Sequence, residues 1–123
     1  MEFTLDRHPT ANLVSHIGPD GIRVGEISIG RSVVMSASKL ILDWPVSSVQ
    51  SLDLGALAPA LELQPEVLLL GTGKRIRFPE SALFATLAAR GIGLEVMSTA
   101  AACRTFNILV NEERPVVAAL ILP

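Results

Sequence analysis

The sequence predicts one α/β domain, residues 1–123, built in three layers from antiparallel N-terminal strands and a C-terminal βαβαβ-like unit with a mixed sheet. Three observations favour this fold class. A chain of 123 residues has a common length for one domain with one core. Apolar residues lie two apart through much of the N-terminal half, which is typical of half-buried strands. Continuous apolar runs alternate with helical patterns in the C-terminal half, which is typical of parallel strands joined by right-handed crossovers.

Composition and charge limit the class of protein. Half of the residues are hydrophobic, but no apolar run approaches the ~20 residues that cross a bilayer. Ten basic and twelve acidic residues give a formal charge of −2, without the basic excess that is usual for binding nucleic acid. One cysteine and two distant histidines exclude a disulfide framework and ordinary zinc spacing. We therefore expect no membrane span, nucleic acid, metal or cofactor.

The first twenty residues predict little regular structure. They mix turn formers with isolated apolar residues, so they are expected to form an irregular arm or a short edge strand. His8 and His16 fall in this segment without a nearby nucleophile or carboxylate, and both are expected to be solvated. Residues 1–7 hold no apolar segment of signal-peptide length, so a cytoplasmic location is expected.

Residues 22–42 predict an antiparallel meander. The pairs that lie two apart are Ile22/Val24, Ile27/Ile29, Val33/Met35 and Leu40/Leu42. Pro45 ends the meander, because proline cannot extend a ladder and biases Trp44 away from helix. Trp44 is expected to close the edge of the core, with an exposed contact point as the alternative.

The next segments predict a short helix and two strands. Leu57, Ala60 and Leu61 recur at helical spacing and predict a helix before Pro65. Glu66 and the continuous apolar run of residues 67–70 predict a strand at residues 66–70 that is covered on both faces, and we expect it to be the central strand of the sheet. Residues 74–78 alternate charge with apolar side chains and predict a strand that turns back in a hairpin across the preceding glycine turn.

The last third of the chain predicts helix, strand, helix and strand in that order. Pro79 and Glu80 are typical of a helix start, and the helix is expected to stop near Gly91. Residues 93–97 predict a strand, after which Ser98 or Thr99 caps a helix that runs to about Val110. Residues 111–115 predict a turn, and residues 116–122 predict the last strand.

The most site-like feature is the glycine loop Gly71-Thr72-Gly73. Ligands of open α/β sheets bind beyond the carboxyl ends of parallel strands, where the N–H groups of helix N-termini attract anions. If the strands at residues 66–70 and 93–97 are neighbours, this loop meets Ser98 and Thr99 in one crevice. The candidate ligand-binding residues are Gly71, Thr72, Gly73, Ser98, Thr99, Arg104 and Asn107. The alternative is a tight turn without a ligand, since the loop matches neither a Walker loop nor a dinucleotide fingerprint.

The remaining polar groups each allow two interpretations. Arg104 and Asn107 lie three apart on one helical face, where they could jointly hold a carboxylate or a backbone group. In the alternative, Arg104 forms a surface ion pair and Asn107 fastens a loop. A basic cluster of Lys74, Arg75 and Arg77 favours a phosphate or an acidic partner, or else protects a strand edge. Cys103 is expected to be a buried, inert thiol, with a lowered pKa as the alternative if it is exposed.

Three segments together resemble a known family. They are residues 65–73, 90–97 and 101–109, and the likeness covers nearly the whole chain, more loosely over residues 22–44. The family comprises small α/β domains of largely unknown function and includes the mitochondrial NADH dehydrogenase (complex I) assembly factor 3. The resemblance implies a compact three-layer domain without an established enzymatic activity. Ser98 stands where the family usually has aspartate, and Phe106 where it often has tyrosine, so acid/base or metal chemistry at this loop is not favoured.

Two functions stay open at this point. The absence of a catalytic set, the resemblance and the apolar richness favour a non-catalytic binding or assembly module with a protein partner. The alternative is a small-molecule or anion-binding protein, an enzyme among the options, that uses the crevice at residues 71–73. Positive mean hydropathy in so short a chain also favours self-association.

Overall fold

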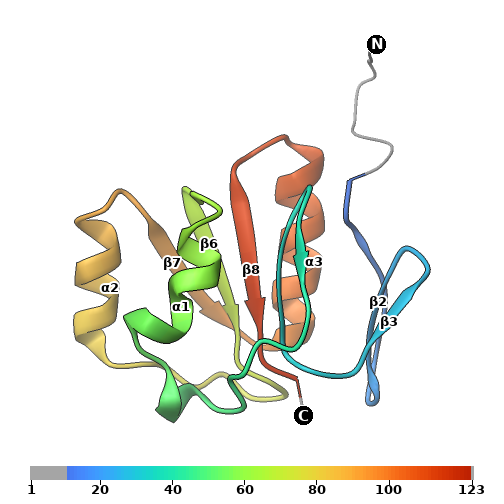
Figure 1. Ribbon diagram of the computed structural model, residues 1–123, viewed down its shortest axis with the longest axis horizontal. Helices are drawn as coiled ribbons and strands as arrows, with labels where there is room; N and C mark the ends of the chain where they lie inside the picture. The colour runs from blue at the N-terminus through green and yellow to red at the C-terminus, as the bar shows by residue number, and fades with distance from the viewer. Residues whose placement is uncertain (1–10, 123) are drawn as a thin grey trace.

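The computed structural model describes residues 11–122, which form two sheets and three α-helices (Figure 1). A small antiparallel sheet contains β1 (Val14–Gly18), β2 (Gly21–Val24) and β3 (Ile27–Ile29). The main sheet has the order β5-β4-β8-β6-β7. Its strands are β4 (Val33–Ser36), β5 (Leu40–Ile41), β6 (Val67–Gly71), β7 (Gly93–Met97) and β8 (Val116–Leu120).

The main sheet is mixed, as the sequence predicted. β6 pairs in parallel with both β7 and β8, whereas β4 pairs antiparallel with β8 and β5. The helices are the 3-10 helix η1 (Val49–Ser51), α1 (Leu54–Leu61), α2 (Ser81–Ala88) and α3 (Thr99–Asn111). Figure 1 shows α1 and α2 on one side of the main sheet, with α3 and the small sheet on the other. The three-layer α/β prediction is therefore confirmed.

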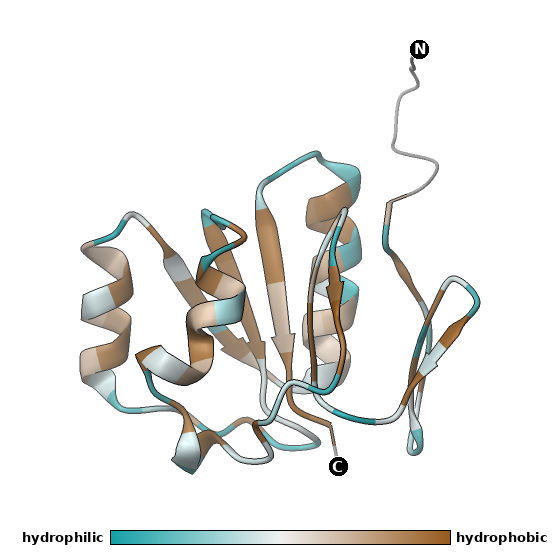
Figure 2. Ribbon diagram, viewed as in Figure 1, coloured by the Kyte–Doolittle hydropathy of each residue, from teal (hydrophilic) through white to brown (hydrophobic). Residues whose placement is uncertain are grey.

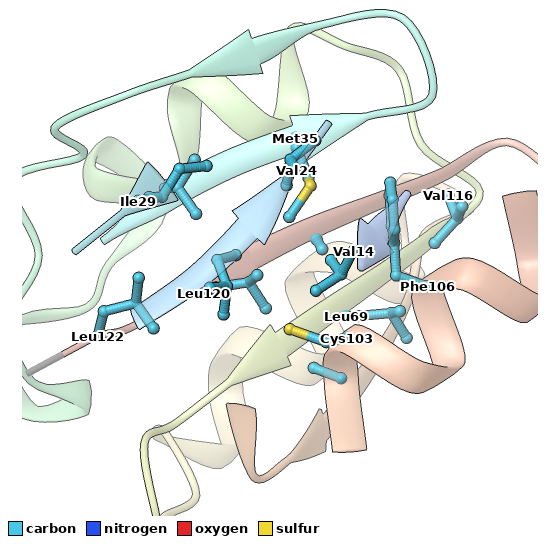
Figure 3. Close-up of a cluster of buried hydrophobic side chains, with 14 of the residues drawn as sticks. Val14, Val24, Ile29, Met35, Leu69, Cys103, Phe106, Val116, Leu120 and Leu122 are labelled. Carbon is cyan, nitrogen blue, oxygen red and sulfur yellow. The ribbon is translucent and has the colours of Figure 1, made fainter. Parts of the chain in front are cut away.

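Alternating side chains of the main sheet separate the core into two clusters. Leu69, Ala118 and Leu120 face α3, where they pack with Cys103 and Phe106 (Figure 3). Their neighbours Leu68, Leu70, Val117 and Ala119 face α1 and α2. Because β6 and β8 are covered on both faces, their sequences are continuously apolar, and Figure 2 shows both strands in the brown shades of hydrophobic residues.

Local signals set the helix starts. Asp53 caps α1 by accepting a 2.7 Å hydrogen bond from the Ala56 amide, and Ser98 caps α3 by accepting one of 3.2 Å from the Ala101 amide. The predicted N-cap at Ser98 is therefore confirmed. The indole of Trp44 is only 4% exposed and donates to the carbonyl of Ala56 at 2.8 Å, so this residue closes the core edge as predicted.

Three strand predictions need correction. Residues 22–42 do not form one meander, because β2 and β3 stay in the small sheet while β4 and β5 join the main one. The break falls at Ser32, whose buried hydroxyl accepts from the Leu122 amide at 3.0 Å and ties β4 to the end of β8. The middle strand of the main sheet is β8, with β6 beside it, rather than β6 itself.

The third correction concerns residues 74–78, which form a loop and not the predicted strand. Both edges of β6 are already paired, with β7 and with β8, so a strand returning across the glycine turn finds no free edge. The loop instead bends around Thr72. The Thr72 hydroxyl donates to the Arg75 carbonyl at 2.6 Å and accepts from the Arg77 amide at 3.1 Å.

The predicted N-terminal arm lies partly outside the described residues, and His8 is among those outside. Residues 14–18 form β1, an edge strand of the small sheet, and His16 is exposed on it. The small sheet is attached to α3 by Asn107. Its side-chain amide donates to the Val14 carbonyl and its side-chain oxygen accepts from the Val14 amide, both at 2.8 Å.

Candidate functional site

The glycine loop and the start of α3 meet at the carboxyl ends of β6 and β7. These strands are parallel neighbours in which Gly71 is paired with Met97, as the crevice hypothesis required. The Thr72 amide donates to the Met97 carbonyl at 3.0 Å, and the Thr99 amide donates to the Gly73 carbonyl at 2.9 Å. The structure therefore brings five of the seven candidate residues together, namely Gly71, Thr72, Gly73, Ser98 and Thr99.

Thr99 holds this junction together from the first turn of α3. Its side chain is buried, with 6% of the residue exposed. Its hydroxyl accepts from the Gly73 amide at 2.8 Å and donates to the Ile121 carbonyl at 2.9 Å. One hydroxyl thus joins the glycine loop, α3 and the segment that follows β8.

The two glycines of the loop have different roles. At Gly71, a Cβ would lie 2.9 Å from Thr99 Cα, so only glycine lets β6 approach α3 this closely. At Gly73, φ is +96°, a conformation that L side chains rarely adopt, while the space around its missing Cβ is open. Gly71 therefore serves packing and Gly73 serves the turn.

The hydrogen bonds of this junction leave few donors for an anion. The amides of Thr72, Gly73 and Thr99 all donate to protein oxygens, and the Ala101 amide donates to the Ser98 hydroxyl. The Ala100 amide, in the first turn of α3, has no hydrogen-bond partner among residues 11–122. The bonded amides thus close the turn, and the Ala100 amide is a donor at the start of α3 without a partner among residues 11–122.

A pocket of about 260 Å³ opens beside the loop. Three candidate residues, Gly73, Ser98 and Thr99, line it together with Lys74 and Ala100. The opposite wall comes from parts of the chain that the sequence did not connect with the site, namely Ile17, Gly18, Pro19, Ile22, Ile121 and Leu122. The apolar pair Ile17 and Ile22 flanking a Gly-Pro-Asp-Gly turn signals a hairpin, but not the surface on which it packs.

Arg104 and Asn107 do not line this pocket. They lie on later turns of α3, where Arg104 is exposed and Asn107 fastens Val14 of the small sheet. Asn107 thus fastens a distant segment, as one interpretation expected, but that segment is strand β1 rather than a loop.

Cys103 is a buried thiol, as predicted. It is fully buried within the cluster of Figure 3. Burial raises the pKa of the Cys103 thiol to about 11, although the nearby Arg104 guanidinium acts in the opposite direction. A raised pKa keeps the side chain protonated at neutral pH and excludes an activated thiolate in the folded state.

The loop of residues 74–78, here called the basic loop, follows the glycine loop and exposes both basic and apolar side chains. Lys74, Arg75 and Arg77 are exposed, and between them Ile76 is 54% and Phe78 is 70% exposed. Phe78 and Arg77 also line a shallow hollow with Val49 and its neighbours on η1. The cations do not protect a strand edge, because this segment forms no strand.

The described residues supply no metal centre and no membrane helix. Among residues 11–122, no group of three His, Cys, Asp or Glu side chains could hold a metal ion. Within the same range, no helix has the length and apolar character needed to cross a bilayer.

Comparison with known proteins places the chain in a family. Residues 14–121 match a family model described as protein of unknown function (DUF498/DUF598). The NADH dehydrogenase [ubiquinone] 1 alpha subcomplex assembly factor 3 of Xenopus tropicalis is 40% identical over 87 residues, 69% of this chain and 48% of the relative. A 13 kDa major membrane protein of Francisella tularensis is 30% identical over 97 residues, 77% of this chain and 76% of that protein. The chain thus spans about half the length of the assembly factors it matches.

Solved structures share the fold closely. A crystal structure from Bordetella parapertussis has a TM-score of 0.86 and 35% identity, covering 93% of this chain and 98% of that one. A solution structure from Bordetella pertussis, described as a Mth938-like domain, has a TM-score of 0.81 and 29% identity, covering 98% of this chain and 92% of that one. The chain therefore belongs to the DUF498/DUF598 family of small α/β domains, which includes the complex I assembly factor 3 proteins.

Proposed function

We propose that the chain is a non-catalytic module that binds another protein during assembly of a larger complex. The observation that carries this proposal is its 40% identity to a protein named as a NADH dehydrogenase assembly factor. An assembly factor acts through contact with the proteins it assembles. No catalytic arrangement of side chains is evident in the site described above.

The basic loop is the contact surface that best suits such a role. It places two apolar side chains, Ile76 and Phe78, among three exposed cations on one projecting segment. Aromatic and arginine side chains are enriched in protein interfaces, where the apolar groups are buried and the charges select the partner. This surface suits a partner that carries acidic side chains around an apolar depression.

Capture of a partner from a lysate of the native organism tests the proposal. The tagged chain is expected to recover a stoichiometric partner, and the double variant Ile76→Ser/Phe78→Ser is expected to lose it. Ile108→Ser is the matched control, because Ile108 is a 57% exposed apolar residue on α3, away from this loop. Recovery of no stoichiometric partner would count against a protein-binding function. Equal capture by the double variant and by Ile108→Ser would count against the basic loop as the contact surface.

A second candidate function rests on the pocket beside the glycine loop. Its volume of about 260 Å³ is close to the lower end of the roughly 300–1,000 Å³ that is usual for small-molecule sites. A ligand for this pocket would therefore be small. A ligand present at 100-fold over its Kd adds about 2.7 kcal/mol to the free energy of unfolding. Thermal-shift measurements with phosphates, nucleotides and carboxylates test this candidate, and no stabilisation by any of them would reject it.

Self-association and a cytoplasmic location both stay predictions. Light scattering of the purified chain measures the oligomeric state directly. Fractionation of native cells measures the location.

A further inference from the structure

The pocket beside the glycine loop differs from the polar crevice that the sequence predicted. Ile17 and Ile22 form its outer wall from the β1–β2 hairpin, and Ile121 and Leu122 form its inner wall after β8. Ile22, Ile121 and Leu122 are at most 7% exposed, so these walls are well packed. Surfaces of this kind hold hydrocarbon in preference to water.

The polar groups that line the pocket do not demand a polar occupant. The Thr99 hydroxyl is already engaged with Gly73 and Ile121, and the Gly73 amide is engaged with Thr99. An aliphatic chain can therefore fill the interior without stranding a buried donor or acceptor.

The charges near the opening favour an anion. Lys74 lines the pocket and is exposed, and it is followed by Arg75 and Arg77 in the basic loop. The Ala100 amide, which has no partner among residues 11–122, lies in the first turn of α3, where the helix dipole is positive. Asp20, on the hairpin turn, lines the neighbouring hollow and is the nearby opposing charge on this hairpin.

We propose that this pocket binds a single-chain aliphatic carboxylate, with its hydrocarbon between the hairpin and Leu122 and its carboxylate at Lys74 and the Ala100 amide. The proposal rests on the small-molecule candidate function and names its ligand class. The volume of about 260 Å³ suits a chain of medium length.

Calorimetric titration of the full chain with hexanoate, octanoate and decanoate, below their micelle concentrations, tests the ligand class. Each pair of added methylenes that enters the pocket is expected to tighten binding, by up to about fourfold per methylene. Trimethyl(nonyl)ammonium, a cation with the same alkyl tail as decanoate, is expected to bind at least about tenfold more weakly. Equal affinity for the cation and the carboxylate, or no dependence on chain length, would overturn the proposal.

Two variants locate the site. Ala100→Leu adds a larger side chain to the pocket wall and is expected to abolish binding, whereas Ala88→Leu, on an exposed position of α2, is expected to leave it unchanged. Lys74→Gln is expected to weaken octanoate binding about two- to fivefold while leaving decanol binding unchanged. Equal binding by Ala100→Leu and the native chain would overturn the location.

Amide resonances provide a readout that does not depend on the variants. Octanoate is expected to shift the amide signals of Ile22, Ala100 and Leu122. Shifts confined to Arg77 and Phe78 would show adsorption on the basic loop and overturn the proposal. If phosphates or nucleotides stabilise the chain and the carboxylates do not bind, the proposed ligand class is wrong while the small-molecule function holds. If no compound binds, the ligand class and the small-molecule function are both wrong.

Discussion

Two adjacent segments at the end of β6 differ sharply in what their residues contact. In residues 71–73, the backbone amides of Thr72 and Gly73 are hydrogen-bonded and Gly71 packs against α3 without room for a side chain. In residues 74–78, every side chain is exposed, including those of Ile76 and Phe78. The first segment therefore contributes to stability, and the second is available for contact with another molecule. Substitutions in the two segments should separate stability from binding.

Gly71→Ala is expected to cause the largest loss of stability. Its Cβ would lie 2.9 Å from Thr99 Cα and 3.0 Å from Thr99 Oγ1, so β6 and α3 must move apart, which costs about 3 kcal/mol of unfolding free energy. Urea denaturation measures the change. Gly93→Ala on β7 is the matched control, because its Cβ would meet the Glu66 carbonyl oxygen at an ordinary 3.8 Å. Equal losses for both variants would contradict the close packing of this turn.

Thr99→Val is expected to lower the unfolding free energy by about 2 kcal/mol, because it leaves the Gly73 amide and the Ile121 carbonyl without their buried partner. Thr99→Ser keeps the hydroxyl and should recover most of the loss. Thr86→Val is the control, since the half-buried Thr86 makes one exposed hydroxyl bond, to the Ala82 carbonyl within α2. A Thr99→Val variant as stable as the native chain would show that the turn does not depend on this hydroxyl.

Alkaline pH should lower the free energy of unfolding through ionisation of the buried Cys103 thiol. Burial raises the pKa of this thiol from 9.0 to about 11, so its contribution to stability is full below pH 9 and is lost as pH rises through 11. The unfolding free energy should fall by about 1.4 kcal/mol between pH 8 and pH 10 relative to a Cys103→Ala variant. Parallel denaturation curves of both chains measure this difference. Identical pH dependence in the two chains would contradict the burial effect.

Ile76→Ser/Phe78→Ser is expected to have the smallest effect on stability, within about 0.5 kcal/mol, because both side chains lie largely in solvent. The same variant is expected to lose the captured partner. Thermal denaturation measured beside partner capture separates the two effects. A large loss of stability would mean that the basic loop packs on the fold, and the comparison between the two segments would no longer hold.

Most elements of the C-terminal half were predictable because their signals are local. Ser98 marks the start of α3, Pro79 precedes α2, and the apolar run after Pro115 becomes β8. The parallel pairing of β6 and β7 also followed from their order and spacing, which placed Gly73, Ser98 and Thr99 at one junction. These features follow from the sequence because each depends on a few neighbouring residues or on the handedness of one crossover.

Only the tertiary structure decided how the elements share strand edges and surfaces. Alternating apolar residues predicted strands between residues 22 and 42, but not that β2 and β3 join the small sheet while β4 and β5 join the main sheet. The alternation at residues 74–78 gave a false strand, because the sequence does not show that β8 occupies the second edge of β6. The pocket wall of Ile17, Ile22 and Leu122 likewise depends on segments far apart in the chain. Hydrophobic periodicity therefore indicated most of the buried positions of this protein, and long-range packing decided which segments lie against them and left Ile27, Leu42 and Phe78 exposed.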